Sequence, residues 1–334
     1  MKTFPGLALT VSLSALLISA CGSDNGSSDT STSAPPPTAV ASSLADRGAS
    51  GEALANGWYG LLAATGTDTD TAPPDQVRAD SALVKPYLDP AFQVQRASGQ
   101  RFLDSDYVPD DVDEFEISNV VVTEPTDDIK VVRYGASTPG ATMPGSSVVF
   151  SNEISPRISV FRWNQDRGHW VIASHANFNT PVAAFCEQAP VKETKEQPPT
   201  SADDVATGEA LVMEWRDITT GKTQKPILDS ANQIQLADGE GWPNPDGSEI
   251  KWSPAKAYKP EDIVITRDGD VLVATYAAIE SGLSVEGRTY GKSGSPRLLT
   301  YRLNDQNEWK LIALANFNSP AQAEKDVDCV AEAG

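Results

Sequence analysis

Apolar residues recur with helical spacing near the start of each half of the chain. In the first half one helical face carries Leu54, Trp58, Leu61 and Leu62. In the second half it carries Ala206, Ala210, Leu211, Met213, Trp215 and Ile218. Ser201 or Asp203 can cap the second helix at its beginning, and Gly221 can end it. A shorter helix is predicted over 75–87, directly after two prolines.

After these helices the apolar positions alternate, which is typical of strands. In the first half the predicted strands cover 92–97, 114–123, 129–137, 157–164 and 170–178. In the second half they cover 233–236, 262–266, 271–278, 297–303 and 309–317. Hairpin turns are expected at 268–270 and 304–307. Helices followed by an antiparallel meander predict an α+β fold, with the helices packed on one face of the sheet.

The second half repeats the first. SPRISVFRWNQDRGHWVIASHANFNTP at 155–181 corresponds to SPRLLTYRLNDQNEWKLIALANFNSP at 295–320. Three further blocks match in the same order: GEALANGW with GEALVMEW, LDPAFQVQRASGQ with LDSANQIQLADGE, and VVRYGA with VATYAA. Matched blocks over this length indicate a duplicated domain. We therefore expect domains at 51–186 and 204–330, joined by a polar, proline-containing linker at 187–203.

The helix with Trp58, the segment YLDPAFQVQRASG and the segment SVFRW…GHWVIASHANFN resemble the SnoaL-like branch of the nuclear-transport-factor-2-like superfamily. The resemblance implies two tandem cone-shaped domains, each a curved antiparallel sheet with N-terminal helices across the mouth of a pocket. It also implies that the two repeats pack sheet against sheet as an internal pseudo-dimer. The second repeat departs from the pattern at Asn232, which replaces Phe92, and over 242–258. The superfamily contains enzymes, scaffolds and binding proteins, so the resemblance does not fix an activity.

The first twenty residues carry one cation, Lys2, followed by an apolar run that is short for a transmembrane helix. This layout predicts a signal peptide over 1–20. The segment Ile18-Ser19-Ala20-Cys21-Gly22 resembles a bacterial lipobox, which implies lipidation of Cys21, for example by palmitate. The alternative is a simple secretory signal with an incidental cysteine. The lipid would anchor the chain in the cell envelope, outside the cytoplasm, on the periplasmic face or at the cell surface.

Residues 21–50 are rich in Ser, Thr, Gly, Ala and Pro, which predicts a disordered tether with a reach of about 30 Å. The net charge of −20 disfavours nucleic acid and anionic lipid headgroups as partners. Cys186 and Cys329 are the two cysteines that remain after Cys21, each shortly past the NFN motif of its repeat. In an oxidising compartment they are candidates for a disulfide, and the alternative is two separately buried cysteines.

The chain carries no phosphate loop, no GxSxG or HExxH motif and no paired-cysteine metal signature, so we expect no cofactor and no metal site. The acidic run over 104–114 lacks the pattern of an EF-hand and is interpreted as a solvated loop. His175 is the catalytic candidate. Strand alternation puts it on one face with Val171, Ala173 and Asn177, opposite Trp170, Ile172, Ser174, Ala176 and Phe178.

The candidate ligand-pocket residues are Trp58, Tyr134, His175 and Asn177. Since Leu314 replaces His175 in the second repeat, histidine-dependent chemistry is confined to the first. The arginines kept in both copies either bind a carboxylate or form ion pairs: Arg157, Arg162, Arg297 and Arg302.

These patterns favour an exported, lipid-anchored, non-catalytic protein that binds a small apolar or carboxylate ligand, or a protein partner, at the cell envelope. One alternative is an acid–base enzyme of the isomerase, dehydratase or hydrolase type that uses His175. Another is an interaction module whose pockets are filled by side chains.

Overall fold

A computed structural model describes residues 43–65, 81–109, 112–141, 152–179, 200–223, 227–243, 251–285, 287–289 and 294–318. The signal peptide, Cys21, most of the tether, Cys186, Cys329 and most of the linker lie outside the described residues. The lipidation and the disulfide therefore stay predictions. No helix in the described ranges is long and apolar enough to cross a membrane.

The first repeat folds into a six-stranded sheet with the order β2-β1-β6-β5-β4-β3. Its strands are β1 (Leu88–Arg96), β2 (Arg101–Leu103), β3 (Glu116–Thr126), β4 (Ile129–Ser137), β5 (Ser155–Asn164) and β6 (His169–Asn177). These bounds contain or closely match the five predicted strands, and they add the short β2. The sequence pattern therefore located every long strand of this sheet.

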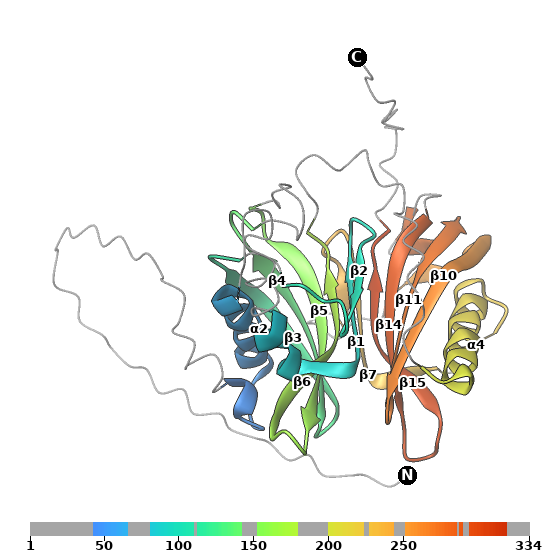
Figure 1. Ribbon diagram of the computed structural model, residues 1–334. Coiled ribbons are helices and arrows are strands. Elements are labelled where there is room, and N and C mark those ends of the chain that lie inside the picture. Colours follow the sequence, from blue (N-terminus) through green and yellow to red (C-terminus); the bar gives the residue numbers. More distant parts are fainter. Residues whose placement is uncertain are drawn as a thin grey trace, which may run out of the picture. The chain divides into compact units, whose positions relative to one another are not determined.

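The second repeat builds an equivalent six-stranded sheet with the order β10-β11-β14-β15-β7-β8. Its strands are β7 (Leu228–Leu236), β8 (Gly241–Trp242), β10 (Ala257–Asp268), β11 (Val271–Ser281), β14 (Gly294–Leu303) and β15 (Trp309–Asn316). A separate three-stranded sheet joins β9 (Trp252–Ser253), β12 (Ser284–Val285) and β13 (Arg288–Thr289). The predicted α+β fold class, with two curved sheets, is confirmed (Figure 1).

The sheets are mixed, which corrects the prediction of a purely antiparallel meander. β1 runs parallel to β6, and β7 runs parallel to β15. In each repeat the first long strand thus pairs with the last one. Such pairing is possible because a long connection separates the two strands in sequence, whereas a short hairpin can join only antiparallel strands.

Helix α2 (Gly51–Thr65) covers the first sheet beside β3 and β4, and α4 (Ala202–Thr219) covers the second beside β10 (Figure 1). The Ser201 hydroxyl accepts a hydrogen bond from the Asp204 amide at 3.1 Å, so the predicted cap is confirmed. Gly51 and Gly208 let each helix approach its sheet closely. A Cβ at these positions would lie 2.1 Å from Val122 and 2.6 Å from Ile265.

The folded part of the first repeat begins before the predicted domain boundary at residue 51. Leu44 is 2% exposed and belongs to the core of that repeat, together with Ala49. The tether, predicted to run to residue 50, therefore ends earlier. Of the shorter helix predicted over 75–87, residues 81–84 and the 3-10 helix η1 (Lys85–Tyr87) are helical, and the earlier part lies outside the described residues.

A β-bulge in β6 changes which side chains share a face. The pairing between β5 and β6 passes from Val160↔Ser174 to Phe161↔Ile172 and skips Ala173. Trp170 and Ile172 consequently face helix α2 with His175, whereas the expected alternation put them on the opposite face. β15 carries the equivalent shift at Ile312.

The faces of the two sheets that are turned away from the helices pack on each other. The buried side chains between them are mostly apolar, and Phe178 stacks on Phe317 with ring centroids 4.2 Å apart. Two glutamines cross this contact reciprocally. The Gln93 amide donates to the Val273 carbonyl at 3.0 Å, and the Gln233 amide donates to the Val131 carbonyl at 2.8 Å.

Candidate functional site

The four predicted pocket residues lie in the first repeat, and three of them form one buried cluster. The rings of Trp58 and Tyr59 on α2 lie 6.1 and 6.4 Å from the ring of His175 on β6. His175 Nδ1 and the Ser159 hydroxyl are hydrogen-bonded at 2.9 Å, and Ser159 bonds the Tyr134 hydroxyl at 3.0 Å. The structure thus brings Trp58, Tyr134 and His175 together beneath the helix.

Asn177 has a different role, because it closes the end of β6. Its side-chain oxygen accepts a hydrogen bond from the backbone N–H of Asn179 at 2.9 Å. Asn316 does the same for Asn318 in the second repeat at 2.9 Å. A contact kept in both copies, at the same turn, indicates a structural function for Asn177.

The side chains of His175 and Tyr134 are uncharged near pH 7. Burial lowers the pKa of His175 well below its ordinary value, and the charges of Arg157 and Arg96 lower it further. Burial also raises the pKa of Tyr134 well above its ordinary value. The hydrogen-bond partner of His175 is a hydroxyl rather than a carboxylate, so the arrangement lacks the charged orienting group of a histidine general base.

The second repeat has Leu314 in place of His175 and holds a buried ion pair near it. Arg297 on β14 donates to Glu280 on β11, with 2.6 Å between Nη2 and Oε1, and both side chains are at most 2% exposed. The hydroxyls of Tyr258 and Tyr276 are hydrogen-bonded at 2.8 Å beside them. A largely apolar cavity of about 100 Å³ adjoins the pair, too small for most ligands of drug size.

Three of the four arginines kept in both repeats form ion pairs, which is one of the two roles that the sequence left open. Arg162 forms an ion pair with Asp89 at 3.0 Å, and Arg302 forms one with Asp229 at 2.7 Å. Burial raises the pKa of Asp89 to about 6, although the charge of Arg162 opposes the rise. Arg162 and Arg302 therefore each form a structural ion pair, and Arg297 forms a third. For Arg157, the fourth of these arginines, the described residues supply no carboxylate partner.

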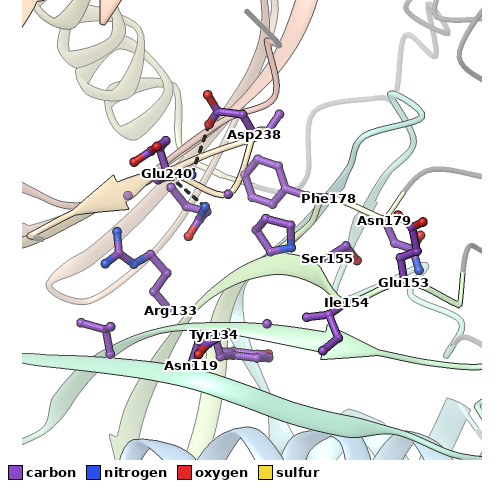
Figure 2. Close-up of a pocket in the computed structure, with 17 residues that line it drawn as sticks. Asn119, Arg133, Tyr134, Glu153, Ile154, Ser155, Phe178, Asn179, Asp238 and Glu240 are labelled. Carbon is purple, nitrogen blue, oxygen red and sulfur yellow. Dashed lines mark hydrogen bonds between the residues drawn. The ribbon is translucent and has the colours of Figure 1, made fainter. Parts of the chain in front are cut away.

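A larger cavity lies where the two repeats meet, and we call it the seam cavity. Its volume is about 670 Å³, within the range of small-molecule sites. It is lined from the first repeat by residues of β3, β4 and β5 and the end of β6, and from the second by 235 and 237–241. Its polar lining residues include Asn119, Glu153, Ser155, Asn179, Asp238 and Glu240 (Figure 2).

The charged groups of the seam cavity are unevenly distributed. Figure 2 shows Asp238 and Glu240 on the second-repeat side, with Glu153 beside Asn179 on the first-repeat side. Arg133 is the basic lining residue, and it donates to the carbonyls of Ile234 at 3.1 Å and Pro243 at 2.9 Å. Burial lowers the pKa of Arg133 to about 10. The lining is therefore polar and acidic.

No group of three or more His, Cys, Asp or Glu side chains able to hold a metal ion occurs in the described ranges. In the acidic run over 104–114, the Asp106 carboxylate accepts a hydrogen bond from the Leu103 amide at 2.6 Å and so stabilises the turn after β2. Asp110 and Asp111 lie outside the described residues.

Sequence reasoning missed Glu280, Arg133 and the acids of the seam cavity. Glu280 carried a usable signal, because it interrupts the apolar end of β11 where the first repeat has Thr138. Arg133 carried none, since a single arginine in a strand is usually exposed.

No family model matches the chain, and no curated protein matches it. Among solved structures, the chain is similar to an NTF2-like protein from Cytophaga hutchinsonii, at 19% identity over 35% of this chain and 97% of that chain, with a TM-score of 0.26. It is also similar to an NTF2-like protein from Rhodospirillum rubrum, at 14% identity over 32% of this chain and 88% of that one, with a TM-score of 0.26.

A third similar structure is an NTF2-like superfamily protein from Salmonella enterica, at 13% identity over 38% of this chain and 94% of that one, with a TM-score of 0.20. At these identities and TM-scores the similarities assign no activity to this chain. The fold rests on the architecture itself: each repeat is a curved six-stranded sheet covered by a helix, as the sequence resemblance implies.

Proposed function

We propose that this chain is an exported, lipid-anchored binding protein that is not an enzyme, and that its ligand occupies the seam cavity. The observation that carries the proposal is the cavity of about 670 Å³ between the repeats. A site of this size suits a small molecule, and interfaces between domains are frequent places for such sites.

The lining favours a polar ligand. Three carboxylates line the cavity, and the terminal nitrogens of Arg133 already donate to backbone carbonyls. Hydroxyl or amino groups would complement such a lining by donating hydrogen bonds to it. Phe178 and Pro156 add a limited apolar surface. We therefore propose a ligand rich in hydroxyl or amino groups.

A cavity-filling substitution tests this proposal. Ala237 lines the seam cavity, and Ala97 occupies the equivalent position after β1 in the first repeat without lining it. We expect Ala237→Trp to weaken binding of the probes trehalose or putrescine by about tenfold or more, the equivalent of about 1.4 kcal/mol. Ala97→Trp should leave binding unchanged. Isothermal titration of the full chain measures both.

The proposal fails if the unsubstituted chain binds neither probe, or if the two variants weaken binding equally. Equal weakening would mean that the larger side chain disturbs the contact between the sheets rather than filling the site. Thermal unfolding of both variants, followed by circular dichroism, controls for that effect.

The alternative is an acid–base enzyme in the first repeat. The hydrogen-bonded chain Tyr134–Ser159–His175 favours it, since such a chain can move a proton between its ends. The alternative is weaker because His175 is 4% exposed and neutral, and because its partner is a hydroxyl.

The proposed anchor has its own test. If Cys21 carries the lipid, Cys21→Ser should abolish incorporation of a radiolabelled fatty acid and move the chain out of the membrane fraction. Fractionation of labelled cells measures both quantities. Unchanged labelling of the variant would contradict lipidation at Cys21, and the binding proposal would be unaffected.

A further inference from the structure

Arg157 in the first repeat and Arg297 in the second are held in the same way. Nη1 of Arg157 donates to the Ser155 hydroxyl at 2.7 Å and the Pro156 carbonyl at 2.8 Å. Nη1 of Arg297 donates to the equivalent serine and proline at 2.7 and 2.8 Å. Each arginine also stands opposite an equivalent tyrosine, Tyr134 or Tyr276. One half of the guanidinium is thus fixed identically in both repeats.

The other half differs between the repeats. Nη2 of Arg297 donates to the Glu280 carboxylate at 2.6 Å. The same carboxylate also accepts a hydrogen bond from the side-chain amide of Asn318 at 2.7 Å. Nη2 of Arg157 is buried and has no hydrogen-bond partner among the described residues. The remaining nitrogen of Arg157, Nε, donates to the Tyr59 hydroxyl at 2.8 Å, so no carboxylate of the described residues neutralises this arginine.

The difference has a direct origin in the sequence. Ala136 and Ala278 hold the same register position, opposite Ser155 and Ser295. Two residues further along, the second repeat has Glu280 and the first has Thr138. Thr138 is 4% exposed but lacks the carboxylate that would reach the guanidinium. Among the described residues, the first repeat therefore keeps the cation without the internal counter-ion that Glu280 supplies in the second.

A buried guanidinium without an anion is costly. Arginine stays protonated at every physiological pH, so it cannot avoid the cost by losing its proton. Breaking a buried ion pair by removing one partner is strongly destabilising, because the remaining charge is left uncompensated. Arg157 is 0% exposed, so bulk water does not solvate it. An external anion would relieve this cost.

We propose that the first repeat binds the carboxylate group of a small organic acid at Arg157, in the position that the Glu280 carboxylate fills in the second repeat. A carboxylate suits the site because the equivalent place already holds one, within reach of an arginine and an asparagine. Asn179 is the equivalent of Asn318. The neighbouring rings of Tyr59, Tyr134 and Phe115 favour a short, apolar remainder of the ligand.

A second buried donor in the same core supports a polar occupant. The indole nitrogen of Trp58 is buried without a hydrogen-bond partner in the described part of the chain, and Trp58 belongs to the same cluster as Tyr59 and Tyr134. Buried polar groups are satisfied in the large majority of cases, so a buried indole nitrogen without an acceptor is compatible with a polar occupant nearby.

Reciprocal exchange of Thr138 and Glu280 tests the proposal. Isothermal titration of the full chain with sodium acetate and sodium butyrate should give one carboxylate bound per chain. Thr138→Glu supplies an internal counter-ion, so binding should be lost and the melting temperature should rise. Thr138→Val keeps the shape of the side chain and adds no carboxylate, so it should keep the binding. Glu280→Thr should create a second site, and acetate should raise its melting temperature.

Several outcomes would overturn the proposal: no binding to the unsubstituted chain, unchanged binding to Thr138→Glu, or loss of binding with Thr138→Val. If chloride or phosphate at equal ionic strength binds as tightly as acetate, the site takes any small anion and the carboxylate assignment is wrong. Should Glu280→Thr not fold, Thr138→Glu and Thr138→Val still decide. Ala237→Trp should bind acetate normally, because Arg157 does not line the seam cavity, although its neighbours Tyr134, Ser155 and Asn179 do.

Discussion

Glu280→Gln should lower the free energy of unfolding by about 3–5 kcal/mol, the typical cost of breaking a buried ion pair by removing one partner. Glu280 is 1% exposed, and its carboxylate accepts hydrogen bonds from both Arg297 and Asn318. Glutamine keeps the size of the side chain, but it leaves the Arg297 charge buried without an anion. The loss should therefore reflect charge rather than packing.

Urea unfolding of the full chain, followed by circular dichroism, measures this loss. Asp128→Asn is the matched control, because the pair of Asp128 with Arg47 is also short, at 2.7 Å, but about half exposed on both sides. Exposed pairs contribute about 0–1 kcal/mol. Similar losses for both variants would show that burial of the Glu280 pair has no special weight.

The sequence was sufficient to predict the α+β fold class and the long strands, because the duplication repeats the same pattern in both halves. The strand predicted over 129–137 was observed as Ile129–Ser137, since turn-forming residues bound it on both sides. The parallel pairing of β1 with β6 could not be predicted, because it depends on a contact between strands far apart in the chain. The bulge at Ala173 also leaves no composition signal, yet it changes the face of every earlier residue in β6.

The candidate sites were less predictable for the same physical reason. His175 attracted attention through its chemistry alone, and the structure surrounds it with Ser159, Trp58 and Tyr59 rather than an acid. The partner of Glu280 lies on the neighbouring strand, and the seam cavity combines residues from both repeats. Such groupings follow from tertiary packing, which a one-dimensional pattern does not encode.

The two repeats share the same fold and several hydrogen bonds, but they differ in the polar side chains of their cores. Both hold an arginine against a serine and a proline, and both end the last strand with an Asn–Asn turn. The second repeat neutralises its arginine internally, whereas the first places a neutral histidine and serine nearby. Duplication removes the need for both copies to bind a ligand, so one copy can become structural while the other retains a site.

The second large effect is expected at Trp58. Trp58→Ala should lower the free energy of unfolding by about 3–5 kcal/mol, the usual cost of truncating a buried tryptophan. Trp58 is 1% exposed, and its ring stacks on Tyr107 with centroids 6.1 Å apart and lies 6.4 Å from Phe92. Its removal would leave a cavity between α2 and the sheet that backbone movement cannot easily close.

The equivalent tryptophan of the second repeat provides the control. Trp215 on α4 is only partly buried and borders a cavity of about 100 Å³, so Trp215→Ala removes fewer contacts and should cost clearly less than Trp58→Ala. Urea unfolding of the two variants measures the difference. Equal losses would mean that the helix of each repeat is anchored to its sheet with the same strength. A larger loss at Trp58, restored in part by Trp58→Phe, would show that the aromatic cluster of the first repeat is the more tightly packed of the two, because phenylalanine refills most of the cavity without the indole nitrogen.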